Sequence, residues 1–454
     1  MVIFRDVSPG YPIKWKYTHR KEMTMICDNA VFSKYRRDFH RILDKEVADD
    51  NHLVDSEKNF SRQRKLSRKD CACLPYKLQE RSIQSKIPHL FNDTPEVTPS
   101  AVAQSRSKFK STLYTNVFDK FNEKTRKYDT KKFKDHSLLG CDGSETNVLP
   151  GDQKNYAKTK NGGHRYFKNL NCLYDVLNHT FVDCLAQPGS EKNEDAAFLE
   201  LALKYKGQKA IFTCDRGYES MATFYKLDQA GIKFVIRIKD QASVNSIIKD
   251  YPKPDTDEYD ISYNVILTTK SSTASLIKNR GKYKYINPNK QSIPFPEGVT
   301  ELPLNLRIVR FWAVCEGNAT LVTVITNLDP EEFSTEDIKE IYKLRWQEEI
   351  GFRTLKGSLS LNSMHSRKEE HIIGEIFAKL TLYNLCSRIR NALEEKKLKK
   401  KHIHKLDFEH AINLIWDNLF LKRPTKGIDD LIRRRTQPER PNRADPRKKK
   451  KIVK

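Results

Sequence analysis

The sequence contains no long apolar run. None of its stretches approaches about 18 consecutive apolar residues, the length that a helix needs to cross a bilayer, so we expect no membrane span. The opening residues, MVIFRDVSPGYPIKWKYTHRK, also lack the apolar centre of a secretory signal peptide, so we expect no signal peptide there. The sequence therefore predicts a cytoplasmic protein without a membrane partner.

Paired cysteine motifs are missing as well. The nine cysteines are scattered along the chain, and an odd number without CxxC spacing does not indicate a disulfide framework. Cys71 and Cys73 enclose a single residue, which places them too close for a standard zinc-binding pair. We expect reduced thiols and no structural zinc.

Acidic residues are outnumbered by basic ones. Lysine and arginine together number 83 against 59 aspartates and glutamates, which gives a net charge of +24. An acidic protein or an anionic membrane is usually met by one local basic patch, whereas these residues run along the whole chain. The simplest partner is therefore a nucleic acid.

The most informative stretch is STEDIKEIYKLRWQEEIGFRTLK, from Ser334 to Lys356, which predicts one amphipathic helix. Ser334 followed by Asp337 resembles a capping box, and no glycine or proline interrupts the stretch before Gly351. An apolar stripe faces the core, with Glu348 among its members. At about 100° per residue, four polar side chains fall within about 60° on another face: Tyr342, Arg345, Glu349 and Lys356.

This polar row holds one acid among three groups that bind phosphate. Such a set suits a metal ion and a nucleic-acid backbone better than it suits a small molecule. The alternative is a solvated helix face held by ion pairs between residues four apart. The metal interpretation requires two further carboxylates elsewhere in the chain.

Two aspartates meet that requirement in a region that alternates strands and helices. SLLGCDGSETNVLP predicts a buried strand carrying Asp142, and NLNCLYDVLNHTFVDCLAQPG predicts two more strands. KAIFTC predicts a fourth strand that ends at Asp215. Three strands, a helix, a strand, a helix and a strand is the order of a ribonuclease-H-like fold, in which function gathers at strand ends. The expected fold class is therefore α/β.

Four regions are expected along the chain. Residues 1–57 are polar and basic without a clear period and predict a poorly structured leader. Residues 58–130 predict a helical DNA-binding lobe, and residues 131–395 a catalytic domain with a β-rich insertion at 241–327. Residues 396–454 predict a C-terminal helix and a disordered basic tail.

Two details of these regions stay open at this point. The helix that begins at Thr98-Pro99-Ser100 is either the recognition helix of a helix-turn-helix element, with Arg106 and its basic neighbours on phosphate, or an ordinary charged helix. In the insertion, Trp312 is either a platform for base stacking or a core residue.

The spacing Tyr342-x2-Arg345-x3-Glu349-x6-Lys356 resembles the Y-R-E-K signature of the insertion-sequence 4 family of bacterial transposases. Asp142-Gly-Ser and Asp215-Arg-Gly-Tyr also stand where that family has its motifs. The resemblance implies that Asp142, Asp215 and Glu349 form a catalytic triad that holds two divalent ions, normally Mg²⁺ with Mn²⁺ as a substitute. It further implies cut-and-paste DNA transposition in a bacterial cytoplasm, with the protein at the nucleoid when it is bound to DNA.

Carboxylates are suited to that chemistry. Hard oxygen ligands leave Mg²⁺ with open or water-filled positions, so one ion activates the attacking hydroxyl and the other stabilises the leaving oxygen. Arg345 and Lys356 are expected to fix phosphates and Tyr342 to donate its hydroxyl to one, while Arg216 pairs either with the triad or with DNA. The implied partners are double-stranded DNA at inverted-repeat ends, target DNA, and a second copy of the chain.

A second class of interpretation is a DNA-binding protein without catalysis, such as a repressor or the inactive remnant of an element. Asp142 and Asp215 would then cap strand ends, and Glu349 would pair with Arg345 or Arg353. Three intact carboxylates in the expected fold order favour the enzyme.

Overall fold

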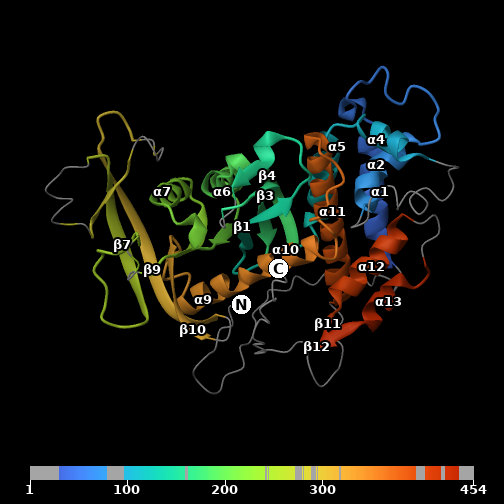
Figure 1. Ribbon diagram of the computed structural model, residues 1–454. Coiled ribbons are helices and arrows are strands. Elements are labelled where there is room, and N and C mark those ends of the chain that lie inside the picture. Colours follow the sequence, from blue (N-terminus) through green and yellow to red (C-terminus); the bar gives the residue numbers. More distant parts are fainter. Residues whose placement is uncertain are drawn as a thin grey trace.

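The computed structural model describes residues 30–78, 97–158, 162–240, 243, 245–270, 279, 281–287, 293, 295–315, 318–394, 404–420 and 425–438. A broad sheet crosses the molecule, with β7, β9 and β10 toward one end and β1, β3 and β4 near the middle (Figure 1). The first and last helices of the chain lie together on the other side. None of the helices in these ranges is long and apolar enough to span a bilayer.

One mixed sheet of ten strands forms the centre of the fold. The strand order is β2-β3-β1-β5-β6-β10-β9-β7-β8, with β4 paired to β3. β1 runs antiparallel to β3 and parallel to β5, and β6 is parallel to β5. The bounds are β1 Ser137–Asn147, β2 Tyr156–Lys158, β3 His164–Asp175, β4 Thr180–Pro188, β5 Ala210–Cys214, β6 Lys233–Ile238, β7 Tyr259–Thr268, β8 Tyr283–Tyr285, β9 Glu301–Cys315 and β10 Asn318–Thr326.

The expected α/β class is confirmed by this arrangement. Between the strands lie α6 (Glu194–Leu203) and α7 (Met221–Gln229), in the order that the sequence predicts. The segment at 241–327 extends the central sheet, because β10 pairs with β6 along Thr323 to Thr326. Its strands therefore continue the sheet rather than forming a separate β domain.

Three helices follow β10: α9 (Thr335–Leu344), α10 (Trp346–Lys356) and α11 (Glu369–Glu394). The sequence predicts one helix where α9 and α10 lie, and this expectation is wrong at Arg345. There the backbone makes tighter bonds, from Arg345 N to Tyr342 O at 3.3 Å and from Glu348 N to Arg345 O at 3.1 Å. Short breaks of this kind often mark functional positions in helices.

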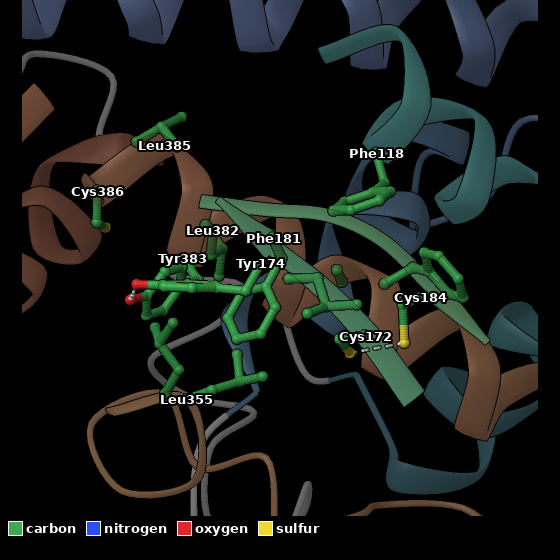
Figure 2. Packing of buried hydrophobic residues seen from close by; sticks show 14 of the residues in the cluster. Phe118, Cys172, Tyr174, Phe181, Cys184, Leu355, Leu382, Tyr383, Leu385 and Cys386 are labelled. Atoms are coloured by element: carbon green, nitrogen blue, oxygen red, sulfur yellow. Dashed lines mark hydrogen bonds between the residues drawn. The ribbon is translucent and has the colours of Figure 1, made fainter. Parts of the chain in front are cut away.

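An apolar core fills the space between the sheet and these helices. In Figure 2, Tyr174 of β3 and Tyr383 of α11 point toward each other, and their hydroxyls lie 2.8 Å apart. Phe181 of β4 packs on both rings, with centroid distances of 4.9 and 4.8 Å. The Sγ atoms of Cys172 and Cys184 lie 3.1 Å apart as free thiols. This face of the sheet is therefore tightly packed under α10 and α11.

Gly351 allows α10 to approach the sheet. A Cβ atom at this position would lie 2.9 Å from Cε2 and 3.0 Å from Cζ of Tyr174, whose ring is fully buried. We expect Gly351→Ala to lower the free energy of unfolding by about 1–3 kcal/mol through overpacking, although alanine favours a helix by about 1 kcal/mol. Chemical denaturation measures this change.

Gly217→Ala is the matched control for that substitution. The nearest atom to a Cβ at Gly217 is 3.9 Å away, which is ordinary contact. Its free energy of unfolding should change by less than about 0.5 kcal/mol. Equal effects of the two substitutions would contradict the packing argument.

A helical lobe lies beside the sheet. Its elements are α1 Ala30–Ala48, α2 Arg68–Lys77, α4 Pro99–Arg106, α5 Thr112–Arg126, α12 Phe408–Leu419 and α13 Ile428–Arg434, with β11 His404–Leu406 paired to β12 Thr436–Pro438. In Figure 1 the N-terminal and C-terminal helices of this lobe stand next to each other and next to α11. The described helices nearest the two ends of the chain thus form one lobe.

Two regional expectations change with this lobe. The prediction of a poorly structured leader is wrong for residues 30–57, since α1 buries Phe32, Tyr35, Phe39 and Leu43 at helical spacing. The part of the leader at 1–29 lies outside the described residues. The region 396–454 contains two helices and a two-stranded sheet, and its basic tail at 439–454 also lies outside the described residues.

Helix α11 joins the lobe to the sheet through buried polar bonds. Arg106, at the end of α4, is buried and forms an ion pair with Glu375 of α11. Burial raises the pKa of Glu375, but Arg106 and His365 lower it to about 2 overall. Asn384 donates to Asn122 of α5 at 2.8 Å. The guanidinium of Arg106 is therefore used inside the protein, which removes it from the basic residues expected on phosphate.

Candidate active site

Asp142 and Asp215 lie side by side where the pairing of the neighbouring strands β1 and β5 ends. The parallel pairing of β1 with β5 ends at Cys141 and Cys214, and the next residue on each strand is Asp142 or Asp215. Each carboxylate accepts a bond at 2.8 Å from the following backbone N–H, that of Gly143 or Arg216. The end of β5 thus brings both acids to one edge, as the strand pattern predicts.

Glu349 joins them from helix α10, which packs over β1. The pKa of Asp142 is raised to about 6, mainly by burial and also by Glu349 and Asp215, against the opposing effect of Arg345. The pKa of Glu349 is also raised, by burial and by Asp215. Because each carboxylate changes the pKa of another, the three form one electrostatic cluster.

Arg345 provides positive charge inside this cluster. Its Nη2 lies 3.1 Å from Oε1 of Glu349, and only 4% of its side chain is exposed. Burial lowers the pKa of the guanidinium, but Tyr342 and the three carboxylates raise it overall. The break between α9 and α10 therefore places Arg345 among the acids rather than on an open helix face.

Tyr342 lies against Arg345 and is buried, with 2% of its surface exposed. The guanidinium carbon lies 5.6 Å from the centroid of the Tyr342 ring. The polar row was expected to lie away from the buried side, and this is wrong for Tyr342 and Arg345. Their polar ends point to the carboxylate cluster because the ring and the guanidinium pack between helix and sheet.

Asp215 is paired with an arginine that the sequence did not single out. Nη1 of Arg237, on β6, lies 3.5 Å from Oδ1 of Asp215 and 3.5 Å from the hydroxyl of Tyr342. Arg216 is exposed beside Asp215, and no ion pair joins it to another residue in the described ranges. Arg216 was expected to pair either with the triad or with DNA. In the structure it is Arg237, and not Arg216, that pairs with Asp215.

Lys356 ends helix α10 on the side of Asp142. It is partly buried, and burial lowers the pKa of its ammonium while Asp142 raises it. Tyr342, Arg345, Glu349 and Lys356 therefore each lie near at least one of the two aspartates. Of these four residues, Lys356 interacts with Asp142 and Cys172 rather than with Asp215.

Glu348 is the residue that breaks the apolar stripe of α10. It is fully buried, and neither carboxyl oxygen has a hydrogen-bond partner among the described residues. Burial raises the pKa of this carboxyl well above its ordinary value, and Asp142 raises it further. A neutral acid is therefore expected at this position, directly beside the charged Glu349.

The chemical nature of the clustered side chains suits a divalent cation. Clustered carboxylates with raised pKa values are stabilised by added positive charge, and their oxygens are the ligands that Mg²⁺ prefers. In this arrangement Arg345 supplies positive charge to the cluster. Within the described ranges, no three His, Cys, Asp or Glu side chains are arranged to hold one metal ion together.

Comparison with known proteins assigns the chain to a family. The model of the family described as "Transposase DDE domain" matches residues 129–385, which is more than half of the chain. The chain belongs to this DDE transposase family. The match contains all the residues expected at the site, from Asp142 to Lys356.

Relatives of this DDE transposase chain come from bacteria. It is 25% identical over 272 residues to the transposase for insertion sequence element IS231E of Bacillus thuringiensis subsp. finitimus, covering 55% of each chain. It is 25% identical over 244 residues to the transposase for IS1151 of Clostridium perfringens, covering 48% of this chain and 49% of that one. The chain spans about half the length of the curated relatives it matches.

A solved structure is also similar to this DDE transposase chain, at a low level. It is titled as a cryo-EM structure of the piggyBac transposase synaptic complex with hairpin DNA. The identity is 14% and the TM-score 0.38, over 91% of this chain and 78% of that one. A likeness of this size carries no argument about the site.

Sequence patterns of this DDE transposase missed two residues for understandable reasons. Arg237 lies inside the strand IKFVIRI, where one cation among apolar residues gives no sign that it faces Asp215. Glu194, at the start of α6, was not among the expected site residues, yet a Cβ at Gly143 would meet its carboxylate and one at Gly217 would lie 3.9 Å from it. Both contacts depend on which strands become neighbours, which local periodicity does not determine.

Proposed function

We propose that this protein is an active transposase that cleaves DNA at the ends of its element and joins those ends to target DNA. The observation that supports it best is the convergence of Asp142, Asp215 and Glu349, from three separate elements, into one cluster around Arg345. Strand caps or solvated helix residues would not need to share an electrostatic site. Membership of the DDE transposase family supports the same activity.

Finer features of the proposal follow from the fold and the residue spacing. We assign the chain to the insertion-sequence 4 group, on the spacing of Tyr342, Arg345, Glu349 and Lys356. We assign β1, β3, β4, β5 and β6 to a ribonuclease-H-like core. In this core β3 pairs antiparallel with both β4 and β1, β5 pairs parallel with β1, and β6 pairs parallel with β5. Residues 58–130 are assigned to DNA binding.

We propose that Asp142, Asp215 and Glu349 would hold the divalent ions of this reaction once DNA and the ions draw their carboxylates together, since no three such side chains of the described ranges are arranged around one ion in this structure. When bound, two Mg²⁺ or Mn²⁺ ions supply charge that activates the attacking oxygen and stabilises the leaving oxygen of the phosphodiester. Arg345 keeps the neighbouring carboxylates ionised, because its fixed positive charge opposes the burial that favours their neutral forms. Tyr342 and Arg237 hold Arg345 and Asp215 in place by packing and charge.

The DNA ligand is proposed to lie over the exposed side of this cluster. Lys356 and Arg216 border it and are available to phosphate as a point charge and a planar donor group, respectively. Arg345 and Tyr342 are buried. We propose that they contact only a phosphate that lies directly at the carboxylates. Double-stranded end DNA, target DNA and a second copy of the chain complete the proposed complex.

The direct test is cleavage of DNA that carries the inverted repeats flanking the coding region. The purified chain with Mg²⁺ should nick or excise the end, and chelation with EDTA should stop the reaction. A protein that binds DNA without catalysis would protect the same ends from nucleases but leave them intact. The absence of any cutting, under conditions where end binding is demonstrated, would establish that second function instead.

Lys356 and Arg216 are expected to act through phosphate charge. Lys356→Ala and Arg216→Ala should each reduce the slope of log affinity against log salt by about 0.9, since each phosphate contact releases about that many counterions. The slope is measured by fluorescence anisotropy with end DNA at several salt concentrations.

Lys206→Ala provides the control for this measurement. Lys206 is exposed before β5, at the end of that strand opposite to Asp215, and should leave the slope unchanged. If Lys356→Ala also leaves it unchanged, then Lys356 does not contact phosphate.

A further inference from the structure

Three aromatic rings gather on a short arm of the sheet, away from the carboxylate cluster. Tyr156 of β2 pairs in register with Tyr166 of β3, and Lys158 pairs with His164. The rings of Tyr156 and His164 are stacked, with centroids 5.2 Å apart and an angle of 19°. The Tyr156 and Tyr166 centroids lie 4.9 Å apart. We call these three rings the aromatic stack.

The aromatic stack is open to solvent, unlike most rings of the protein. Tyr156 is 41% exposed, and His164 is exposed as well. β2 stands at one end of the strand order, so no further strand among the described residues pairs with its outer edge. A cross-strand pair of rings stabilises a sheet by only about 0.2–1 kcal/mol. A buried pair would give the same stabilisation, so stability does not explain why these rings are exposed. Exposure of this size indicates a surface for a ligand with flat faces.

Two lysines lie beside the aromatic stack. Lys158 is exposed directly opposite His164. The side chain of Lys154, in the turn before β2, is 66% exposed, and its Nζ lies 3.6 Å from Oε1 of Glu191. Arg165, between the two ring-bearing residues of β3, faces the opposite side of the strand and pairs with Glu145. Rings combined with cations are the composition that binds unpaired nucleotides, because bases stack on the rings while lysines neutralise phosphates.

The aromatic stack lies on the same face of the sheet as Asp142. Alternate residues of a strand share a face, so Tyr166 and Cys172 point to the same side, and Cys172 is paired with Asp142. Tyr166 precedes Cys172 by six positions, which corresponds to about 20 Å along the strand at about 3.3 Å per residue. Lys168 and Leu170 between them and Cys172 itself are buried, so DNA would bridge this distance over the helices that cover the face, in about six steps at about 3.4 Å each.

From these observations we infer that the aromatic stack binds unpaired nucleotides of DNA whose cleaved end lies at Asp142, Asp215 and Glu349. The choice of DNA as the ligand rests on the proposed function. Base pairs in a continuous duplex hide the faces of their bases, so the ligand is a single-stranded extension or a strand separated from its partner near the end. The surface would hold that strand away from the site while the end is processed.

Binding is tested without metal, so that cleavage does not enter the measurement. The probes are a 12-nucleotide oligothymidine, a blunt duplex, and a duplex with a five-nucleotide extension, each bound to the full chain in EDTA. Tyr156→Ala should weaken binding of oligothymidine and of the extended duplex by about five- to 100-fold, the usual effect of losing one base–aromatic stack. Binding of the blunt duplex should change by less than about twofold.

Matched variants separate stacking from folding and from charge. Tyr156→Trp should retain binding, whereas Tyr156→Leu, which is apolar but cannot stack, should lose it as the alanine variant does. Tyr285→Ala removes another exposed tyrosine, 44% exposed on β8, and should have no effect. Equal losses for blunt and single-stranded probes, or no loss with any probe, would overturn the inference.

A fluorescent base locates the contact. With 2-aminopurine placed in turn at each of the first eight positions from the end, the wild type should change its emission most at about three to six nucleotides, and Tyr156→Leu should remove that change. A wild type that cuts DNA but binds the strand without help from Tyr156 would remove this inference and leave the proposed function intact. Binding that depends on Tyr156 in a protein that never cuts would do the reverse.

Discussion

Asp142→Asn, Asp215→Asn and Glu349→Gln are each expected to reduce metal-dependent cleavage of end DNA by at least about a thousandfold. Each change removes a carboxylate charge without changing side-chain size, and a metal site supplies several kcal/mol at about 1.4 kcal/mol per factor of ten. Affinity for the same DNA should fall by less than about threefold, because loss of an acid does not weaken phosphate contacts. Gel analysis of cleaved ends and anisotropy on the same samples give both numbers.

Glu348→Gln is the matched control for Glu349→Gln. The two glutamates are adjacent in α10, but Glu348 is buried without a hydrogen-bond partner among the described residues, whereas Glu349 is 30% exposed and paired with Arg345. Because burial raises the pKa of the Glu348 carboxyl well above its ordinary value and so favours the neutral acid, an amide should replace it with a change in cleavage of less than about threefold. Loss of cleavage in Glu348→Gln, with activity kept in Glu349→Gln, would exchange the roles assigned to the two residues.

Cleavage should also depend steeply on pH below about 6. The pKa of Asp142 is raised to about 6 in the folded chain by burial and by Glu349 and Asp215, against an ordinary value of 3.8. A divalent cation binds the ionised carboxylate, so at limiting Mg²⁺ the rate should fall about tenfold per pH unit below the pKa. Saturating Mg²⁺ should move the fall to lower pH, because the cation competes with the proton.

Stability without metal should show the opposite trend. Between pH 3.8 and about 6 the folded chain holds a proton on Asp142 that the unfolded chain has released. The contribution of Asp142 to the free energy of unfolding therefore falls as pH rises through this window. Asp175 has a pKa of about 6 for the same main reason, burial, and adds a similar trend.

The difference between wild type and Asp142→Asn isolates the active-site part of that trend. Thermal unfolding from pH 4 to 7.5, with and without Mg²⁺, should show a smaller decline for Asp142→Asn than for wild type in EDTA. Mg²⁺ should stabilise the wild type above about pH 6 and have little effect at pH 4.5. A wild type whose response to Mg²⁺ is the same at both pH values would argue against a carboxylate cation site at Asp142.

Local pattern predicted the centre of the fold well. The strand carrying Asp142, the strand that ends before Asp215, and the helices before and after the latter follow from the apolar pattern, and the structure has them at the expected places. The assignment of the three carboxylates to one site came from a resemblance of spacing, and their electrostatic coupling agrees with it. Features that depend on residues close in sequence were thus accessible.

Features that depend on distant neighbours were not accessible in the same way. The break at Arg345 has no glycine or proline to mark it, and it follows from the attraction of a buried guanidinium to acids from β1 and β5. The continuation of the sheet through β10 requires β6 as its partner, which no local period indicates. Helix α1 lies in the region predicted to be poorly structured, although the stretch YRRDFHRI within it allowed a helix, and its buried residues Phe32, Tyr35, Phe39 and Leu43 recur at helical spacing.

The helical lobe needs helix α11 for its packing, and α11 is synthesised long after the helices α4 and α5 that it contacts. Arg106 and Asn122 find their partners Glu375 and Asn384 only after the ribosome has added more than 250 further residues. A chain interrupted before Glu369 would leave Arg106 without its counter-ion and the apolar side of α5 without cover. Prematurely terminated copies should therefore be cleared by proteolysis rather than accumulate as fragments that occupy DNA, and only full-length translation would yield a competent lobe.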